Sequence, residues 1–219
     1  MSDEQKPFEK PGKHADEITI RFDDDENLYV SKAFLGHVSP VFHTMFQGEF
    51  KEAMTSEVDI KDIRRADFLE FLLCCNPGTM ADITSENVFR VVTIAHKYDV
   101  RALVNRCKNI MDTMLKEPLK IETTPPDAFD NSKAALIRQL YLFLKICRVA
   151  ISFNWSETAN EAFRCTTKAS SLCDLNSFKL PQIIPGNTQD EEHVSAMIFN
   201  ALPRDVSLLI LHIMPPGWG

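Results

Sequence analysis

Residues 28–46 read LYVSKAFLGHVSPVFHTMF, and this stretch contains the signals for a short strand followed by two short helices. Leu28–Val30 resumes a strand pattern after a polar break. Ser31 can accept a hydrogen bond at the start of a helix and so cap it. Ser39 and Pro40 repeat this signal, because a capping residue followed by proline at the first helical position begins a new helix. The stretch therefore predicts a strand, a helix and a second helix in direct succession.

Two further strands flank this stretch. Residues 18–22 (ITIRF) alternate apolar and polar side chains, which predicts a half-buried strand. The polar residues 23–27 separate it from Leu28–Val30, so these two strands are expected to form a hairpin. The acidic residues 23–26 lack the ligand spacing and the glycine of a calcium loop and indicate a solvated turn. Residues 57–60 (EVDI) alternate again and predict a third strand.

The sequence that follows the third strand is helical in pattern. Residues 65–75 predict a helix that ends at Asn-Pro-Gly, residues 76–78. Thr84 is predicted to cap the next helix, whose apolar positions are 88, 91, 92 and 95. Apolar positions between 100 and 115 recur with the helical period of 3.6 residues. The predicted order is therefore strand, strand, two helices, strand and then helices only, which favours an α+β domain.

Prolines at positions 118, 125 and 126 mark a boundary after this domain. Beyond it, a long apolar helix is expected at 132–153, and further helical stretches at 156–170 and 189–201. The expected organisation is a disordered N-terminus, an α+β domain, a linker and an all-α C-terminal extension, covering residues 1–15, 16–116, 117–131 and 132–219.

Composition and charge exclude several classes of partner. The 219 residues carry 24 Lys and Arg against 31 Asp and Glu, a net charge of −7. This acidic balance disfavours nucleic acid and anionic membranes as partners. No apolar stretch reaches the ~20 residues of a membrane-spanning helix. The N-terminal residues show no secretory signal. We therefore expect an intracellular protein of the cytoplasm or nucleus, with no nucleic-acid and no membrane partner.

The sequence offers no constellation typical of an enzyme. Phosphate-binding glycine loops and the Gly-x-Ser-x-Gly elbow are absent. The six histidines do not pair with cysteines, or with each other, at zinc-ligand spacing. The six cysteines lack a Cys-x-x-Cys pair and are interpreted as free thiols. We therefore predict no catalytic residue, no metal site and no cofactor.

Residues 16–111 resemble a BTB/POZ domain. The resemblance is carried by an ordered series of segments: DEITIRF for the first core strand, LYVSKAFLGHVSPVFHTMF for the second strand and a helical hairpin, QGEFKEAMTSEVDIKDI for a loop and the third strand, ADFLEFLLCCNPG for the next helix, and ITSENVFRVVTIAHKYDVRALVNRCKNIM for the final helix pair. It implies the BTB/POZ fold, a small three-stranded sheet flanked by helical hairpins, followed here by the all-α extension.

The resemblance also implies a function. BTB domains are protein-interaction modules, and many are adaptors that join a cullin scaffold to a substrate protein in a ubiquitin ligase. Others oligomerise transcription regulators or channel subunits. The chain is therefore expected to be a substrate adaptor of a cullin-based ubiquitin ligase. The alternative is an oligomerisation or transcription-regulatory scaffold with no role in a ligase.

The mark of a cullin adaptor in this family is a hydrophobic-x-Glu triplet before the third strand, which here is Phe50-Lys51-Glu52. An exposed aromatic ring can anchor in a pocket of the partner, and a nearby carboxylate can bond a donor at the rim. Alternatively, Phe50 folds back onto the core and Glu52 is only solvated. The resemblance places three further residues, each able to be core or surface, on elements that face the cullin: Met45, Phe46 and Tyr98.

A second feature implied by the resemblance is a charged pair of Asp16 and Lys32. In transcription regulators of the family, this pair lines a groove used by corepressors. Alternatively, it is an ion pair that serves folding and contributes little if exposed.

The oligomeric state and the substrate stay open. Dimeric members carry an extra helix before the first core strand, and residues 1–15 hold two prolines and cannot form an amphipathic helix. The chain is thus a monomer, or a homo- or hetero-dimer through another surface. No MATH-like or kelch-like domain is evident, so the substrate protein binds the C-terminal segment or a second BTB protein. The helix at 132–153 enlarges the cullin-binding groove or closes a core of its own.

Overall fold

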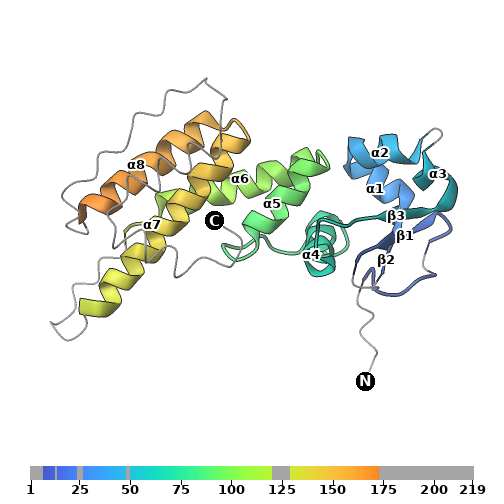
Figure 1. Ribbon diagram of the computed structural model, residues 1–219, viewed down its shortest axis with the longest axis horizontal. Coiled ribbons are helices and arrows are strands. Elements are labelled where there is room, and N and C mark those ends of the chain that lie inside the picture. The colour runs from blue at the N-terminus through green and yellow to red at the C-terminus, as the bar shows by residue number, and fades with distance from the viewer. Residues whose placement is uncertain (1–6, 13, 24–26, 48–49, 120–128, 173–219) are drawn as a thin grey trace. The chain divides into compact units, whose positions relative to one another are not determined.

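The computed structural model of the chain describes residues 7–12, 14–23, 27–47, 50–119 and 129–172 (Figure 1). The chain divides into two compact units, Met1–Ile110 and Met111–Gly219. Among the described residues, no helix combines the length and the apolar character that crossing a bilayer requires.

The first unit contains one sheet of three strands, β1 (Glu17–Arg21), β2 (Leu28–Ser31) and β3 (Glu57–Asp59). Their order is β2-β1-β3, so β1 lies in the middle. β1 pairs with β2 in antiparallel fashion, with Ile18 opposite Val30, and with β3 in parallel fashion. The predicted hairpin and the predicted third strand are therefore confirmed.

One face of this sheet contributes to the hydrophobic core. A strand with one buried and one solvated face alternates apolar and polar side chains, and β1 and β2 follow this rule. The core-facing side chains of the sheet are at most 3% exposed, and they are Ile18, Ile20, Leu28, Val30 and Val58. Their burial supplies part of the apolar area that offsets the conformational entropy lost on folding.

Two short helices follow β2 directly, α1 (Lys32–Val38) and α2 (Pro40–Phe46), and they pack against each other (Figure 1). The Ser31 hydroxyl oxygen accepts a hydrogen bond of 3.2 Å from the first turn of α1. The Ser39 hydroxyl oxygen accepts one of 3.1 Å from the N–H of Phe42 in α2. Both capping serines predicted from the sequence are therefore confirmed.

Ser39 is fully buried and does more than cap α2. Its hydroxyl also donates to the carbonyl oxygen of Tyr98, at 2.5 Å, and Tyr98 is the residue that ends α5 (Val88–Lys97). The ring of Phe42 stacks on the ring of Tyr98, with centroids 4.4 Å apart. The hydrogen bond and the ring contact together fix α2 to the end of α5.

The helices α4 and α5 agree with the sequence prediction except at one cap. α4 (Arg65–Cys75) has the predicted bounds. The residue that precedes α5 is Asn87, not Thr84. The buried side-chain oxygen of Asn87 accepts a hydrogen bond from the Thr84 N–H (2.8 Å), and its amide nitrogen donates to the carbonyl of Asp82 (3.1 Å). A side-chain amide can do both because it carries an acceptor and two donors, so Asn87 organises this turn.

The structure contains a short helix where the sequence predicted only a loop. This helix, α3 (Lys51–Thr55), lies between α2 and β3. Five residues are too few for a helix to be stable on local interactions alone, and no helical period is visible over so short a span. The helix therefore depends on tertiary contacts that the sequence pattern does not reveal.

The N-terminal segment also differs from the expectation that residues 1–15 are disordered. The side chain of Phe8 is buried, and its carbonyl oxygen accepts a hydrogen bond of 2.8 Å from the N–H of Tyr29 in β2. The carboxylate of Glu9 lies 3.4 Å from the guanidinium of Arg65. A single aromatic residue in a polar, proline-containing stretch gives no periodic signal, so the sequence pattern could not reveal this attachment.

The last three helices of the described residues are α6 (Arg101–Lys116), α7 (Phe129–Ser152) and α8 (Ser156–Leu172). α6 confirms the helical period found between 100 and 115. α7 and α8 form an antiparallel hairpin in the second unit (Figure 1). The predicted helical stretch at 189–201 lies outside the described residues.

The buried residues of the α7–α8 hairpin are mostly large on α7 and small on α8. The buried residues of α7 recur at helical spacing and are Leu140, Phe143, Ile146, Cys147 and Ala150. Those of α8 are small, namely Thr158, Ala162, Thr166 and Ala169. The described part of the hairpin therefore buries its apolar stripe.

Replacing Ser39 with alanine is expected to destabilise the protein by about 1–2 kcal/mol, because it removes a helix cap and leaves the Tyr98 carbonyl with one partner fewer. Chemical denaturation measures this change. Thr44→Ala is the matched control, since the Thr44 hydroxyl also donates to a carbonyl in α2, that of Pro40 at 3.0 Å, but is exposed. The control should cost less than about 0.5 kcal/mol. Equal effects of the two substitutions would contradict the assignment.

Candidate protein-interaction site

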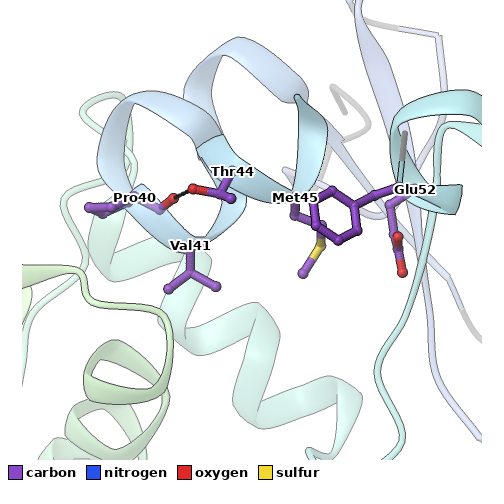
Figure 2. Close-up of a pocket in the computed structure, with 6 residues that line it drawn as sticks. Pro40, Val41, Thr44, Met45 and Glu52 are labelled. Atoms are coloured by element: carbon purple, nitrogen blue, oxygen red, sulfur yellow. Dashed lines mark hydrogen bonds between the residues drawn. The ribbon is translucent and has the colours of Figure 1, made fainter. Parts of the chain in front are cut away.

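An open hollow lies on the surface of the first unit between α2 and the start of α3 (Figure 2). Its lining is mostly apolar, with one carboxylate, and consists of Pro40, Val41, Thr44, Met45, Phe50 and Glu52. Three of the predicted contact residues, Met45, Phe50 and Glu52, are therefore brought together on one surface.

α2 presents different residues to the core and to the hollow. Phe42 is fully buried and faces the core. Val41 and Met45 are four residues apart, so they share a face of the helix, and Figure 2 shows both projecting toward the hollow. Because Ser39 fixes the start of α2, the direction of this second face is fixed as well.

The triplet residues Phe50 and Glu52 lie at the N-terminal end of α3. Phe50 immediately precedes the helix, in extended conformation, and its side chain is 54% exposed. The ring is therefore not part of the core. Glu52 lies in the first turn and is half-buried, a position where a helix favours a carboxylate. Together they place an exposed aromatic ring and an acidic group at the edge of the hollow.

Most of the large apolar residues that are exposed within the described part of the chain lie on α2 or α3 or directly before α3, and two of them, Val41 and Phe50, line the hollow. There are four, namely Val41, Phe50, Met54 and Met80, with exposed fractions of 37%, 54%, 78% and 54%. Three of them belong to α2 or to α3 with its preceding residue. Single exposed apolar residues are common, but a cluster at one place is typical of a protein-interaction surface.

The two remaining predicted contact residues, Phe46 and Tyr98, are packed against the ring of Phe42. The ring of Phe46 is half-buried and lies 5.9 Å from the ring of Phe42. Tyr98 is only 6% exposed, and burial, with a smaller effect of Asp62, raises its pKa to about 12. The structure therefore gives Tyr98 a packing role, because the stack on Phe42 covers its ring.

Val41 and Met54 are not among the contact residues predicted from the sequence. Both leave a signal in retrospect. α2 carries apolar residues at 41, 42, 45 and 46, which is more than one buried face of a short helix can hold. Met54 follows Phe50 by four residues, the spacing of neighbours on a helix surface.

Asp16 and Lys32 are neighbours, as expected, because the backbone N–H of Lys32 donates to the carbonyl oxygen of Asp16 at 3.0 Å, but within the described residues no ion pair joins their side chains. The Asp16 carboxylate instead accepts hydrogen bonds from the Ala33 N–H (2.7 Å) and the Ser31 hydroxyl (2.8 Å) at the start of α1. These bonds lower the pKa of Asp16, the one from Ala33 most. The Lys32 ammonium donates to the carbonyl oxygen of Ala53 in α3, at 3.4 Å. A helix start with unpaired N–H groups competes successfully for the carboxylate.

Burial makes two of the described thiols unreactive. Burial raises the pKa of Cys75 and of Cys107 to about 12, so both thiols are protonated at neutral pH, the form that is a poor nucleophile. In the described ranges, no group of three or more His, Cys, Asp or Glu side chains is placed to hold a metal ion. The exposed ring of Phe50 and the apolar lining of the hollow suit this surface to binding a protein partner.

Comparison with known proteins agrees with this interpretation. Residues 6–115 match the BTB/POZ domain family, and the chain therefore belongs to this family. The matched range includes Phe8, whose attachment to β2 places it within the domain. BTB/POZ domains are protein-interaction modules, so this chain carries such a module.

Curated relatives match the same part of the chain. BTB and MATH domain-containing protein 38 of Caenorhabditis elegans is 31% identical over 86 residues, which cover 39% of this chain and 22% of that protein. BTB and MATH domain-containing protein 15 of the same organism is 36% identical over 102 residues, 44% of this chain and 37% of that protein. BTB/POZ domain-containing protein 6 of Xenopus tropicalis is 36% identical over 87 residues, 40% of this chain and 16% of that protein. The match thus spans less than two fifths of each relative.

Replacing Asp16 with asparagine is expected to lower the free energy of unfolding by about 0.5 kcal/mol at pH 7, a small effect because the carboxylate is exposed. The pKa of Asp16 in the folded protein lies below its ordinary value of 3.8. Its stabilisation is therefore present above that pH and is lost as the pH falls through the lowered pKa. Denaturation at several pH values should show the two proteins converging in acid. Asp23→Asn, at an exposed aspartate after β1, is the control, and a pH-independent difference for Asp16→Asn would contradict the prediction.

Proposed function

We propose that the chain is a substrate adaptor of a cullin-based ubiquitin ligase and that it binds the cullin through the surface of α2 and α3. The observation that carries this proposal is the exposed ring of Phe50 beside a largely apolar hollow, with Glu52 at its edge. The family resemblance assigns the same two positions to cullin contact.

The surface has the chemistry of an interface centre. Aromatic anchors dominate binding energy when they enter a desolvated pocket of the partner. Phe50 supplies such an anchor, and Val41 and Met45 supply apolar walls that could receive a side chain of the cullin. Glu52 offers a charged acceptor at the rim, where electrostatics govern the association rate more than the affinity.

Two features support a ready-made surface. The buried Ser39 hydroxyl and the Phe42–Tyr98 stack hold α2 in place. The rest of the surface comes from α3, which follows α2 after a short connection. A preformed surface loses less conformational freedom on binding, so more of the contact energy appears as affinity.

The proposal also concerns the helical extension and the place where the substrate protein binds. The α7–α8 hairpin buries the described part of its apolar stripe, which favours a stable helical unit. Several relatives are named for a MATH domain beside their BTB domain. We propose that substrate recognition uses residues C-terminal to the BTB domain, or a second BTB protein bound to this one.

Replacing Phe50 with alanine is expected to weaken binding to a cullin N-terminal region by about 30-fold or more, which corresponds to about 2 kcal/mol. Calorimetric titration measures the affinity. Met80→Ala is the matched control, because Met80 is also 54% exposed but lies on the turn after α4. The control should bind as the unchanged protein does. An unchanged affinity of Phe50→Ala would remove this ring from the interface, and no binding by the unchanged protein would favour the scaffold alternative.

Replacing Glu52 with glutamine is expected to lower the association rate about three- to tenfold at low salt, with a smaller change in the dissociation rate, because a rim charge mainly steers the encounter. The difference should shrink as salt is added. Surface plasmon resonance at two salt concentrations tests both points. Glu86→Gln, at an exposed glutamate before α5, is the control. A deficit that persists unchanged in high salt would contradict the steering role.

A further inference from the structure

We infer that Lys32 is a positioning residue for this interaction: its ammonium group, from α1, holds α3 in place and thereby orients Phe50 and Glu52. The expected effect of Lys32 on cullin binding rests on the proposed function. The contact itself belongs to the structure, where the Lys32 Nζ atom lies 3.4 Å from the carbonyl oxygen of Ala53.

α3 needs such an external support. It has five residues, and a helix of this length is not stable in isolation. Phe50 is its N-terminal cap residue but makes no side-chain capping hydrogen bond. None of the residues of α3 is fully buried. Local interactions and burial therefore do not explain why α3 is ordered.

Two tertiary attachments lie at the C-terminal end of α3. Ser56 follows the helix with a positive φ of 55° and ends it, and the Ser56 carbonyl accepts a hydrogen bond of 3.0 Å from the N–H of Thr19 in β1. The Ala53 carbonyl, one of those left unpaired at a helix end, receives the Lys32 ammonium. A cation near the C-terminus of a helix is favoured by the helix dipole as well as by the hydrogen bond.

A second lysine contact at α3 is expected to matter less. The ammonium of Lys51 lies 3.4 Å from the Asp59 carboxylate, but the two side chains are 69% and 46% exposed. Exposed ion pairs of this kind contribute little. The contact of Lys32 is partly buried, where water competes less for the ammonium group. Lys51 is therefore the natural control for Lys32.

The use of Lys32 for this purpose fits the arrangement around Asp16. Because the Asp16 carboxylate caps α1 through Ser31 and Ala33, it does not hold the lysine side chain toward β1. Lys32 is the first residue of α1, a position where a positive charge does not help its own helix. The hydrogen bond from its ammonium group to the Ala53 carbonyl in α3 gives a reason for a lysine at this position.

Lys32→Met keeps most of the apolar stem of the side chain and removes the donor and the charge. We expect binding to a cullin N-terminal region to weaken about three- to tenfold, because α3 must then be ordered during binding. In the full chain, ¹⁵N relaxation should report faster internal motion for residues 51–55, with β1 and α4 unchanged. Lys32→Arg should keep both the affinity and the relaxation of residues 51–55 close to those of the unchanged protein, since arginine also donates from a charged group. Lys51→Met should change both readouts less than Lys32→Met does.

The relaxation measurement does not need a cullin. It therefore tests the positioning role of Lys32 independently of the proposed function. If the unchanged protein does not bind the cullin region, the proposed function is wrong, and the mobility of α3 in Lys32→Met still tests the positioning role. If residues 51–55 are as ordered in Lys32→Met as in the unchanged protein, the positioning role is wrong. In a Phe50→Ala background, Lys32→Met should cause a smaller further loss of affinity than it does alone, because only Glu52 remains of the two groups that it positions. An additive loss would overturn the inference.

Discussion

The buried hydroxyl group of Ser39 is the contact on which the geometry of the interaction surface depends. It accepts from the first turn of α2 and donates to the end of α5, so one side chain joins two elements that are about 60 residues apart in sequence. A hydroxyl suits this task because it is donor and acceptor at once. The stack of Phe42 on Tyr98 adds apolar contact to the same junction. Because the start of α2 is fixed in this way, the side chains of all the following residues of the helix point in defined directions.

α2 shows how one short helix can serve both folding and recognition. A helix of seven residues makes two turns, so neighbouring positions in sequence point in different directions. Phe42 faces the core, and Val41 and Met45 face the hollow. Both faces belong to the same short helix. A substitution that tilts α2 would therefore disturb both the packing of the core and the shape of the hollow.

Local sequence signals predicted most of the fold and only part of the site. Strand alternation, the serine caps and the helical period after residue 100 depend on neighbours in sequence, and these predictions hold. α3, the attachment of Phe8 and the turn around Asn87 depend on partners distant in sequence or on a side-chain amide with two roles, which no periodic pattern encodes. The position of Phe50 was predictable from the family triplet, but its exposure was not, because an aromatic ring before a strand can pack inward or outward. The partners of Asp16 and Lys32 were missed because a charge pattern does not show that a helix end can compete for either group.

The division of tasks between α2 and α3 has a consequence for how this surface can change. The core of the domain involves α2 directly, whereas α3 has no fully buried residue. Substitutions of exposed residues away from caps and cores change stability by less than about 0.5 kcal/mol as a rule. Phe50, Glu52 and Met54 can therefore vary with little effect on folding, while each change alters what the surface recognises. An interaction module built in this way can acquire a new partner by altering α3 alone, because the junction at Ser39 keeps the neighbouring wall of the hollow unchanged.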